Sequence, residues 1–489
     1  MDSVLPFGLS YLWLPTARRL STMGFVLSIL YFVTYYLTPP VLFGPLAAAR
    51  VELILAMLIL LVSLPRLTGS IILKTPQSVA LIGLAFAAVC SVLIGMHWAG
   101  GIVQAFLAFM PNAFAYFLVC LHCNSKKKLQ AIVLMLLFVC LFVIAHGYID
   151  LLHGVPESGP LQPGVTQSTD QNLWNIEHPY LLAMNNDAGE LLYRLRGLGI
   201  INDPNDFSQL IVCLIPLLFI FWRPKKMLWN IGFVVFPVCA LLYGVYLTHS
   251  RGALLALLAM MILAARRRTG TLPALLIAGG VFFAAMALNF TGGRDISAGA
   301  GSDRTALWSE GLQMLKFHPL FGVGLNSFAD KCAGCNQTAH NSLVVCAAEL
   351  GLFGLYFWCL FLFPSVRDAL AIASPAKVSE AVQAMPVGLF LQGTSKIKVI
   401  DKAEVNRLGR LLVLSLTGFL VAGWFLSRAY IMTFFLLGGM VEVVFEMALQ
   451  RGMIVPRMRL ARVLLYAGGL AVLLVLMMYI LLRTVNFMH

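Results

Sequence analysis

The sequence contains few charged residues. Only 11% of its 489 residues are Asp, Glu, Lys or Arg, whereas 60% are hydrophobic, and the mean hydropathy is +0.87. A typical soluble domain carries about 25% charged residues, and so few charges could not cover the surface of a soluble protein of this length. The composition therefore excludes a soluble enzyme, a disordered protein and a fibrous protein. It indicates an integral membrane protein.

Apolar runs close to the about 20 residues that a helix needs to cross the hydrocarbon core recur along the chain. About thirteen spans are predicted, near residues 22–38, 46–64, 77–96, 101–122, 129–148, 207–222, 228–248, 252–265, 272–290, 341–364, 409–427, 429–448 and 462–482. These runs are unbroken, unlike the alternating strands of a membrane β-barrel. We therefore expect an all-α, polytopic membrane protein with about 12–13 transmembrane helices and two long outer loops.

The spans and loops divide the chain into seven segments. Transmembrane helices are expected in 1–148, 207–290, 341–364 and 409–489. The two long outer loops, which the family resemblance given below would make periplasmic, are 149–206 and 291–340, and 365–408 is expected to be a cytoplasmic insert. The sequence lacks an internal repeat, which weighs against a transporter built from inverted halves.

Lysine and arginine are concentrated in alternate loops. They fall in 18–19, 66–74, 126–128, 223–226, 266–268, 367–410 and 451–462, which hold about 24 of the 34 basic residues. Because basic loops remain in the cytoplasm, this side of the protein is predicted to be cytoplasmic. The net charge of +13 is then a signal of topology and of attraction to anionic membrane lipids. The sequence shows no motif that reads a nucleic-acid groove, and we expect no nucleic-acid partner.

Among the basic residues that fall on the opposite side, four arginines are candidates for function. Arg194 and Arg196 precede a span, Arg251 begins one, and Arg304 lies in the second long loop. The planar guanidinium suits phosphate and stays charged when partly buried. Several such residues together predict a clamp for a lipid diphosphate. The alternative is that each arginine pairs locally with an acid, namely Asp203, Asp206, Asp303 or Glu310.

His340 and Asn341 open the span that follows the second loop. A neutral imidazole at this boundary can take a proton from a hydroxyl nucleophile, which would make His340 a general base. The alternative is a histidine that only caps a helix or forms a hydrogen bond. Asn341 is a suitable helix N-cap under both interpretations.

The ten cysteines do not form a disulfide framework, because most lie in or beside spans as small hydrophobic residues. Cys332 and Cys335 differ, since they lie in the second outer loop shortly before His340. In an oxidising compartment we expect them to form a short disulfide. A zinc site that uses both with His340 is short of ligands, and a thioredoxin-like redox role lacks its βαβ context. We expect no metal site.

Four short segments around the two outer loops carry a family resemblance. They are RLRGLGIINDPNDF at 194–207, THSRGALL at 248–255, DRTALWSEGLQMLKFHPLFGVGLNSF at 303–328 and AHNSLVVCAAELGLFGLYFW at 339–358. In their order and placement they resemble the O-antigen ligase/polymerase family of bacterial envelope glycan transferases, the Wzy_C type. The resemblance covers the centre of the chain, and the Cys-Ala-Gly-Cys segment and the 365–408 insert depart from it.

The resemblance implies a multi-pass enzyme of the bacterial inner membrane whose active site faces the periplasm. It implies transfer of a glycan from undecaprenyl diphosphate to an acceptor hydroxyl, with no cofactor. The donor diphosphate would be bound by Arg194, Arg196, Arg251 and Arg304. His340 would act as the base, and Asn205 would orient sugar or phosphate. The expected partners are the lipid-linked glycan donor, a glycan or lipid A-core acceptor, and membrane lipids.

A diphosphate already leaves readily, so such an enzyme mainly positions its substrates and stabilises the charge that develops on phosphate. Arginine can supply that charge in place of a divalent cation. We therefore expect a metal-independent glycosyltransferase.

The motifs do not separate three acceptors. A ligase would use lipid A-core, a polymerase would use a second lipid-linked repeat, and a protein O-glycosylation enzyme would use Ser or Thr. A lipid-linked glycan transporter is the alternative from a different class. It would carry charged residues along a cavity that reaches both faces, whereas here the unexplained Arg and His residues cluster on one side.

Overall fold

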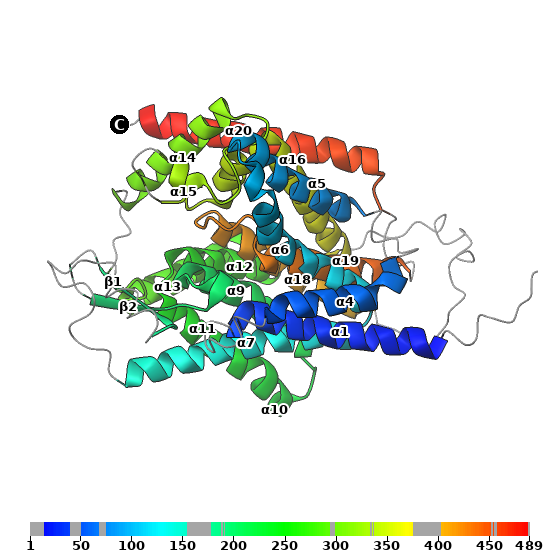
Figure 1. The fold of residues 1–489 in the computed structure, drawn as a ribbon. Coiled ribbons are helices and arrows are strands. Elements are labelled where there is room, and N and C mark those ends of the chain that lie inside the picture. The colour runs from blue at the N-terminus through cyan, green and yellow to red at the C-terminus, as the bar shows by residue number, and fades with distance from the viewer. Residues whose placement is uncertain are drawn as a thin grey trace, which may run out of the picture.

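The computed structural model describes residues 14–39, 50–67, 75–153, 178–186, 189, 191–293, 299–332, 335, 337–374, 402–450, 453 and 457–487. Long helices run side by side and form a bundle (Figure 1). The hairpin of β1 (Leu181–Asn185) and β2 (Leu191–Leu195) lies at the left end of the bundle in this view, where α14 (Gly299–Phe317) and α15 (Phe328–Lys331) also lie. The two strands pair antiparallel, with Leu181 opposite Leu195.

The helices of the first half are α1 (Leu14–Leu37), α4 (Val51–Leu67), α5 (Pro76–Cys90), α6 (Ile102–His122), α7 (Lys126–Leu152), α9 (Pro204–Leu217), α10 (Met227–Asn230) and α11 (Phe236–Thr248). Those of the second half are α12 (Arg251–Thr269), α13 (Thr271–Ala287), α14, α15, α16 (Ser342–Ala373), α18 (Lys402–Gly423), α19 (Met432–Leu449) and α20 (Leu460–Phe487). Short π-helical turns extend α5 at Ser91–Gly95 and join α10 to α11 at Ile231–Val235.

Each span that hydropathy predicts falls on a helix. Within the described ranges, nine helical segments are long and apolar enough to cross a membrane, and shorter apolar helices lie at Thr22–Leu37, Val51–Leu64 and Thr271–Ala287. The remaining predicted span, 252–265, lies in α12, whose last turn carries three arginines. The prediction of an all-α, polytopic membrane protein is therefore confirmed. The division into seven segments stays a prediction, and α16 runs nine residues beyond the end at 364 that hydropathy gave it.

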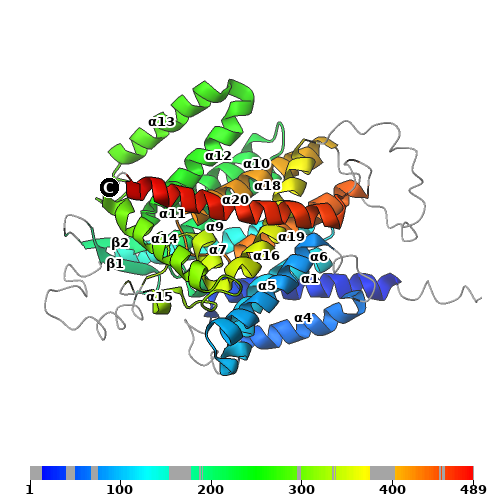
Figure 2. The same ribbon diagram turned by 90° about the horizontal axis from the view of Figure 1, so that it is seen from above.

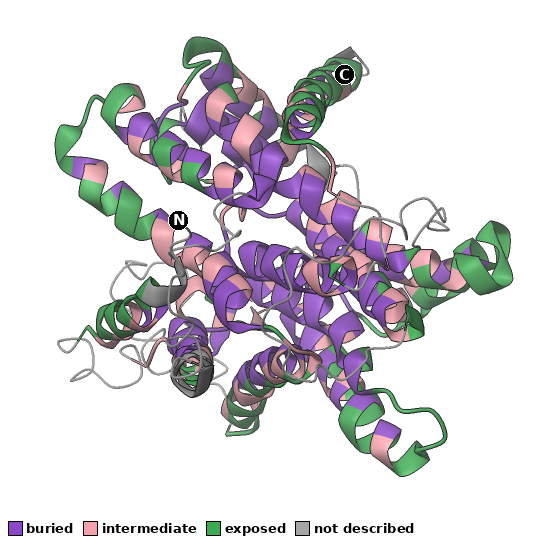
Figure 3. Ribbon diagram, turned by 90° about the vertical axis from the view of Figure 1, so that its right-hand side faces the viewer, coloured by how far each residue is buried: buried purple, intermediate pink, exposed green. Residues whose placement is uncertain are grey.

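Peripheral helices carry the lipid-facing surface. Buried residues gather in the middle of the bundle and exposed residues on the outer helices (Figure 3). Seen from above, α13 stands away from the rest and α20 crosses the outside of the bundle (Figure 2). Leu276 and Phe283 of α13 and Leu465 and Leu473 of α20 are among the most exposed large apolar side chains. Apolar surface of this extent is unusual on a soluble monomer and is suited to contact with lipid.

Basic loops that are distant in sequence meet at one end of the bundle. Lys126 at the start of α7 forms an ion pair with Glu404 of α18. Arg407 Nη1 donates a hydrogen bond of 2.9 Å to the carbonyl oxygen of Trp222. We call this the basic end of the bundle. When successive helices cross a membrane in opposite directions, every second loop lies on the same side. The basic loops alternate along the sequence, so they are expected to meet at one end of the bundle, as they do here.

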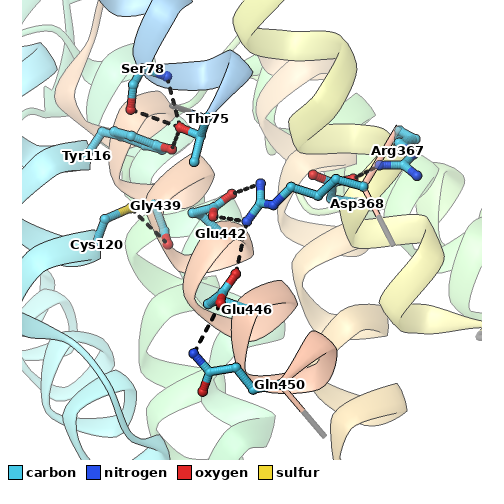
Figure 4. A network of polar contacts seen from close by, with 11 residues as sticks. Thr75, Ser78, Tyr116, Cys120, Arg367, Asp368, Gly439, Glu442, Glu446 and Gln450 are labelled. Atoms are coloured by element: carbon cyan, nitrogen blue, oxygen red, sulfur yellow. Dashed lines mark hydrogen bonds and ion pairs between the residues drawn. The ribbon is translucent and has the colours of Figure 1, made fainter. Parts of the chain in front are cut away.

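A polar network lies near the basic end (Figure 4). Arg457, in the chain before α20, donates to both carboxylate oxygens of Glu442 and, at 3.3 Å, to Glu446, both on one face of α19. Arg367 of α16 pairs with its buried neighbour Asp368 at 2.6 Å. These carboxylates lie on apolar spans, so their pairing with arginine offsets the cost of burying charge there.

The α14–α16 connection is fixed to a break in α16. Gly351 has φ +66° inside this helix, and a Cβ there would lie 2.4 Å from the carbonyl oxygen of Leu320. The break lets Leu320 accept a hydrogen bond from the amide of Phe353, while Val323 donates to Ala348. Only glycine fits this conformation without steric cost. The chain after α14 is thereby held against the N-terminal part of α16.

Candidate functional site

Three helices begin close together at the end of the bundle opposite the basic end. Asp203 caps α9 by accepting from the amide of Asn205 at 2.7 Å. Ser250 caps α12, and Asn341 caps α16 through the amides of Leu343 and Val344 at 2.9 and 3.1 Å. The predicted N-cap at Asn341 is confirmed. Helix N-termini carry partial positive charge and favour anions. We call this region the site end.

Arg194 joins the hairpin to the start of α9. It lies on β2, is buried, and donates through Nε to the carbonyl oxygen of Thr248 at 2.8 Å. Its Nη2 donates to Asn205 Oδ1 at 3.0 Å. Asn205, predicted to orient sugar or phosphate, thus holds a predicted diphosphate-binding arginine.

Arg251 and Arg304 come together in one pocket. The pocket is lined by both arginines, by Asn205 and by Phe425, together with the first turn of α12. The guanidinium of Arg304 lies over the Phe425 ring, 5.7 Å from its centroid. Burial lowers the pKa of Arg304, and the neighbouring charge of Arg251 lowers it further. Two like charges in a partly buried pocket repel each other, and an anion between them relieves that repulsion.

Arg196 takes a different position. Its Nε donates to the carbonyl oxygen of Pro179 at 3.1 Å, and its backbone amide donates to Tyr180 at 2.9 Å. Burial lowers its pKa, an effect that the Asp203 carboxylate opposes. The structure therefore places Arg196 beside Pro179 and Tyr180 at the open end of the hairpin, whereas Arg194 contacts Asn205, which lines the pocket.

His340 lies near Arg304 in a strained turn. Its φ of +49° is a left-handed conformation that costs a residue other than glycine about 1–2 kcal/mol. Burial lowers the pKa of His340 below 6.5 and the charge of Arg304 lowers it further, while Asp203 opposes both. The imidazole is therefore neutral at neutral pH, which is the form that can accept a proton.

The helices that carry Arg304 and His340 are tied directly. Trp308 lies one turn after Arg304 in α14, and its Nε1 donates to the carbonyl oxygen of Ala339 at 2.9 Å. Glu349 of α16 accepts through Oε1 from the amide of Phe328 at 3.3 Å. These contacts hold α14 and the chain that follows it against the start of α16.

Among the described residues, pairing with an acid does not account for Arg304. Asp206, one of the acids proposed as a local partner, instead binds Arg428, with Nε and Nη2 at 2.6 and 2.5 Å from Oδ2. Within the described part of the chain, Arg304 forms no ion pair. The side chain of Asp303 lies outside the described residues.

Arg428 is the site residue that sequence reasoning missed. It lies between α18 and α19 at the site end, so it breaks the charge bias in the same way as the four predicted arginines. The same rule could have found it. Its neighbour Ser427 accepts a hydrogen bond of 2.8 Å from the backbone amide of His340.

Cys332 and Cys335 form a disulfide in the structure, with their Cα atoms 5.6 Å apart. The bond lies in the chain between α15 and His340. It ties both sulfurs to each other, which disfavours the alternative zinc site.

Comparison with protein-family models gives a match that contains both pocket arginines and His340. No curated protein matches the chain. The family model described as O-antigen ligase, Wzy_C, matches residues 236–359. This range holds Arg251, Arg304 and His340, whereas Arg194 and Asn205 lie outside it and reach the site through contacts. The match confirms the resemblance drawn from the motifs: the central segment of this membrane protein, residues 236–359, is similar to the O-antigen ligase family.

Proposed function

We propose that this protein is an O-antigen ligase-type glycosyltransferase. In this proposal it moves a glycan from undecaprenyl diphosphate to a hydroxyl of lipid A-core, on the periplasmic side of the bacterial inner membrane. The observation that carries the proposal is the pocket shared by Arg251 and Arg304, with His340 near Arg304. The family match supports a membrane enzyme of the glycosyltransferase type.

The pocket suits a diphosphate for three reasons. Its two arginines supply opposite charge and several donors. The N-terminal turns of α9 and α12 reach the same pocket through Asn205 and Arg251, and they add backbone donors and a positive dipole end. Arg194 lies behind Asn205 and extends the positive region. In this proposal Arg194 and Arg196 support the donor site, which Arg251 and Arg304 contact directly.

The chemistry then follows from the positions of the groups. His340 takes the proton of the acceptor hydroxyl as its oxygen attacks the anomeric carbon of the donor glycan. The bond between the anomeric carbon and the phosphate oxygen breaks, and undecaprenyl diphosphate leaves with the bonding electrons. Arg251 and Arg304 stabilise the charge that grows on this leaving group. The proton on His340 passes to water, and no redox step or cofactor is involved.

Reconstitution with defined substrates tests the proposal. The purified protein is placed in liposomes with an undecaprenyl-diphosphate-linked glycan, with and without lipid A-core, and the products are separated. Glycan joined to lipid A-core supports a ligase. Chain growth without lipid A-core would instead identify a polymerase, and movement of the donor across the bilayer with no new glycosidic bond would identify a transporter.

The role of His340 is tested by His340→Ala in the same assay. Loss of the base is expected to lower the transfer rate about 10²–10⁴-fold, while donor binding changes little. His318→Ala is the matched control, because His318 is an exposed histidine just after α14. Undiminished transfer by His340→Ala would remove His340 from the mechanism.

Metal independence is a separate part of the proposal. If arginines supply the positive charge that stabilises the leaving group, transfer should proceed at the same rate in EDTA as in magnesium. Inactivity in EDTA that magnesium reverses would overturn this part and leave the donor and acceptor assignments standing.

A further inference from the structure

We propose that the turn formed by Leu426, Ser427, Arg428 and Ala429, anchored by Asp206, positions His340 for proton transfer. We call it the 426–429 turn. It connects α18 to α19 and lies more than 80 residues beyond His340 in the sequence. The inference rests on the proposed function, because it concerns the base of that reaction. It assigns Ser427, Arg428 and Asp206 as positioning residues.

The turn holds the chain on both sides of His340. Ser427 Oγ accepts from the backbone amide of His340 at 2.8 Å. Ser342, two residues later, donates through Oγ to the carbonyl oxygen of Leu426 at 2.7 Å, and Ser342 Oγ also accepts from the Arg428 amide at 3.1 Å. These hydrogen bonds stabilise the left-handed conformation of His340, which the residue would otherwise leave.

Two further contacts hold the turn itself. Trp358 of α16 donates through Nε1 to the carbonyl oxygen of Ala429 at 3.0 Å. The guanidinium of Arg428 donates from Nε and Nη2 to Asp206, a side chain only 2% exposed in the first turn of α9. The turn is therefore fixed to α9 as well as to α16.

The pair of Arg428 and Asp206 links the base to the donor pocket. Asp206 follows Asn205, which binds Arg194 and lines the pocket. Leu426 and Phe425 line the same pocket from the turn and the residue before it. Two neighbouring residues at the start of α9 therefore hold both parts of the site. Asn205 holds Arg194, and Asp206 holds the 426–429 turn through Arg428. A displacement of α9 would move both.

Replacing Ser427 is the least disruptive test. It removes the hydrogen bond to the His340 amide and leaves the ion pair of Arg428 and Asp206 intact. Ser427→Ala is expected to lower kcat about tenfold or more, since misplacing a reacting group by about 1 Å can cost about 100-fold. KM for the donor is expected to stay within twofold. Ser427→Thr keeps the hydroxyl and should restore kcat. Ser365→Ala is the control: it also removes one serine hydroxyl, which donates to the carbonyl oxygen of Phe361 within α16 and has no contact with the 426–429 turn.

The pH profile distinguishes positioning from a purely structural role. The charged groups that face His340 are Arg304 of α14 and Asp203 ahead of α9. If Ser427→Ala lets the imidazole move out of its buried place, its pKa rises toward the ordinary value. The acid limb of the kcat profile should then shift to higher pH. A variant that only reduces the amount of folded protein would lower activity by the same factor at every pH, and the acid limb would stay at the same pH.

Arg428→Ala and Arg428→Lys complete the experiment. Lysine keeps the charge but not the two-nitrogen contact with Asp206, so its kcat should fall between those of wild type and Arg428→Ala. An unchanged kcat and an unmoved acid limb in Ser427→Ala, with His340→Ala inactive, would overturn the positioning inference alone. Full activity of His340→Ala would instead overturn the base assignment on which the inference rests.

Discussion

Arg457 at the basic end and Arg304 at the site end are held in opposite ways. At the basic end, Arg457 binds the carboxylates of Glu442 and Glu446, and Arg367 binds Asp368 (Figure 4). At the site end, Arg194 is held by a carbonyl and an amide oxygen, and Arg304 lies over an aromatic ring. Carboxylates neutralise a guanidinium, whereas neutral dipoles and ring faces hold it and leave its charge in place. Arg457 thus contributes to cohesion, whereas Arg304, which has no ion pair among the described residues, keeps a positive charge that can face an anion.

The largest expected effect is on stability at the basic end. Arg457→Gln leaves Glu442 buried without its partner, which is expected to cost about 3 kcal/mol or more of unfolding free energy. Transfer per folded molecule should change little. Thermal unfolding in detergent and the reconstituted assay measure the two quantities. The double variant Glu442→Gln/Arg457→Gln removes both charges and should recover part of the loss. No recovery would show that the pair contributes little.

The next effect is on activity at the site end. Arg251→Gln removes a charge that, in the proposed function, faces the donor diphosphate. Transfer is expected to fall about 100-fold, which is the usual loss when an enzyme lacks one hydrogen-bond donor to the transition state. Folding should tolerate this change, because it relieves repulsion with Arg304. Arg268→Gln at the far end of α12 is the control. A large stability loss with normal transfer would break the contrast between the two ends.

A smaller effect is expected in the pH profile. His340 must be neutral to act as a base, and burial and Arg304 lower its pKa. Activity should therefore persist below pH 6.5 and be lost as the pH falls through this lowered pKa. Arg304→Gln removes one cause of the shift, so the acid limb should move to higher pH, measured relative to the variant's own maximum. Lys316→Gln, also in α14, should leave the limb where it is. An unmoved limb in Arg304→Gln would mean that another group controls it.

Local sequence patterns predicted much of the architecture. Hydropathy alone located the spans, because an apolar run must be buried in lipid whatever its neighbours are. The capping role of Asn341 also followed from sequence, since it depends on backbone amides two and three residues away. The charge bias identified Arg251 and Arg304, which the fold brings into one pocket.

Tertiary contacts account for what the sequence did not reveal. Asp206 and Arg428 are 222 residues apart, so no local pattern could pair them, and Asp206 looked like a partner for nearer arginines. The span at 341–364 seemed a single helix, since the break at Gly351 leaves its hydropathy unchanged. Nor does sequence predict the left-handed turn at His340, which depends on Ser427 and on the contact of Trp308 with Ala339.

The smallest effect is expected at Asn205, and it tests how neutral contacts serve the site end. Asn205→Ala removes one hydrogen bond to Arg194, worth about 1 kcal/mol, so KM for the donor should rise about fivefold with kcat nearly unchanged. Asn205→Asp still accepts from Arg194 but adds negative charge beside Arg251 and Arg304. If the pocket binds an anion, this variant should bind donor more weakly than Asn205→Ala, as isothermal titration with the lipid-linked glycan would show. Tighter binding of the donor would mean that the positive charge of these arginines is not needed to bind an anion. Arg251 and Arg304 would then have a structural role, like Arg457 at the basic end.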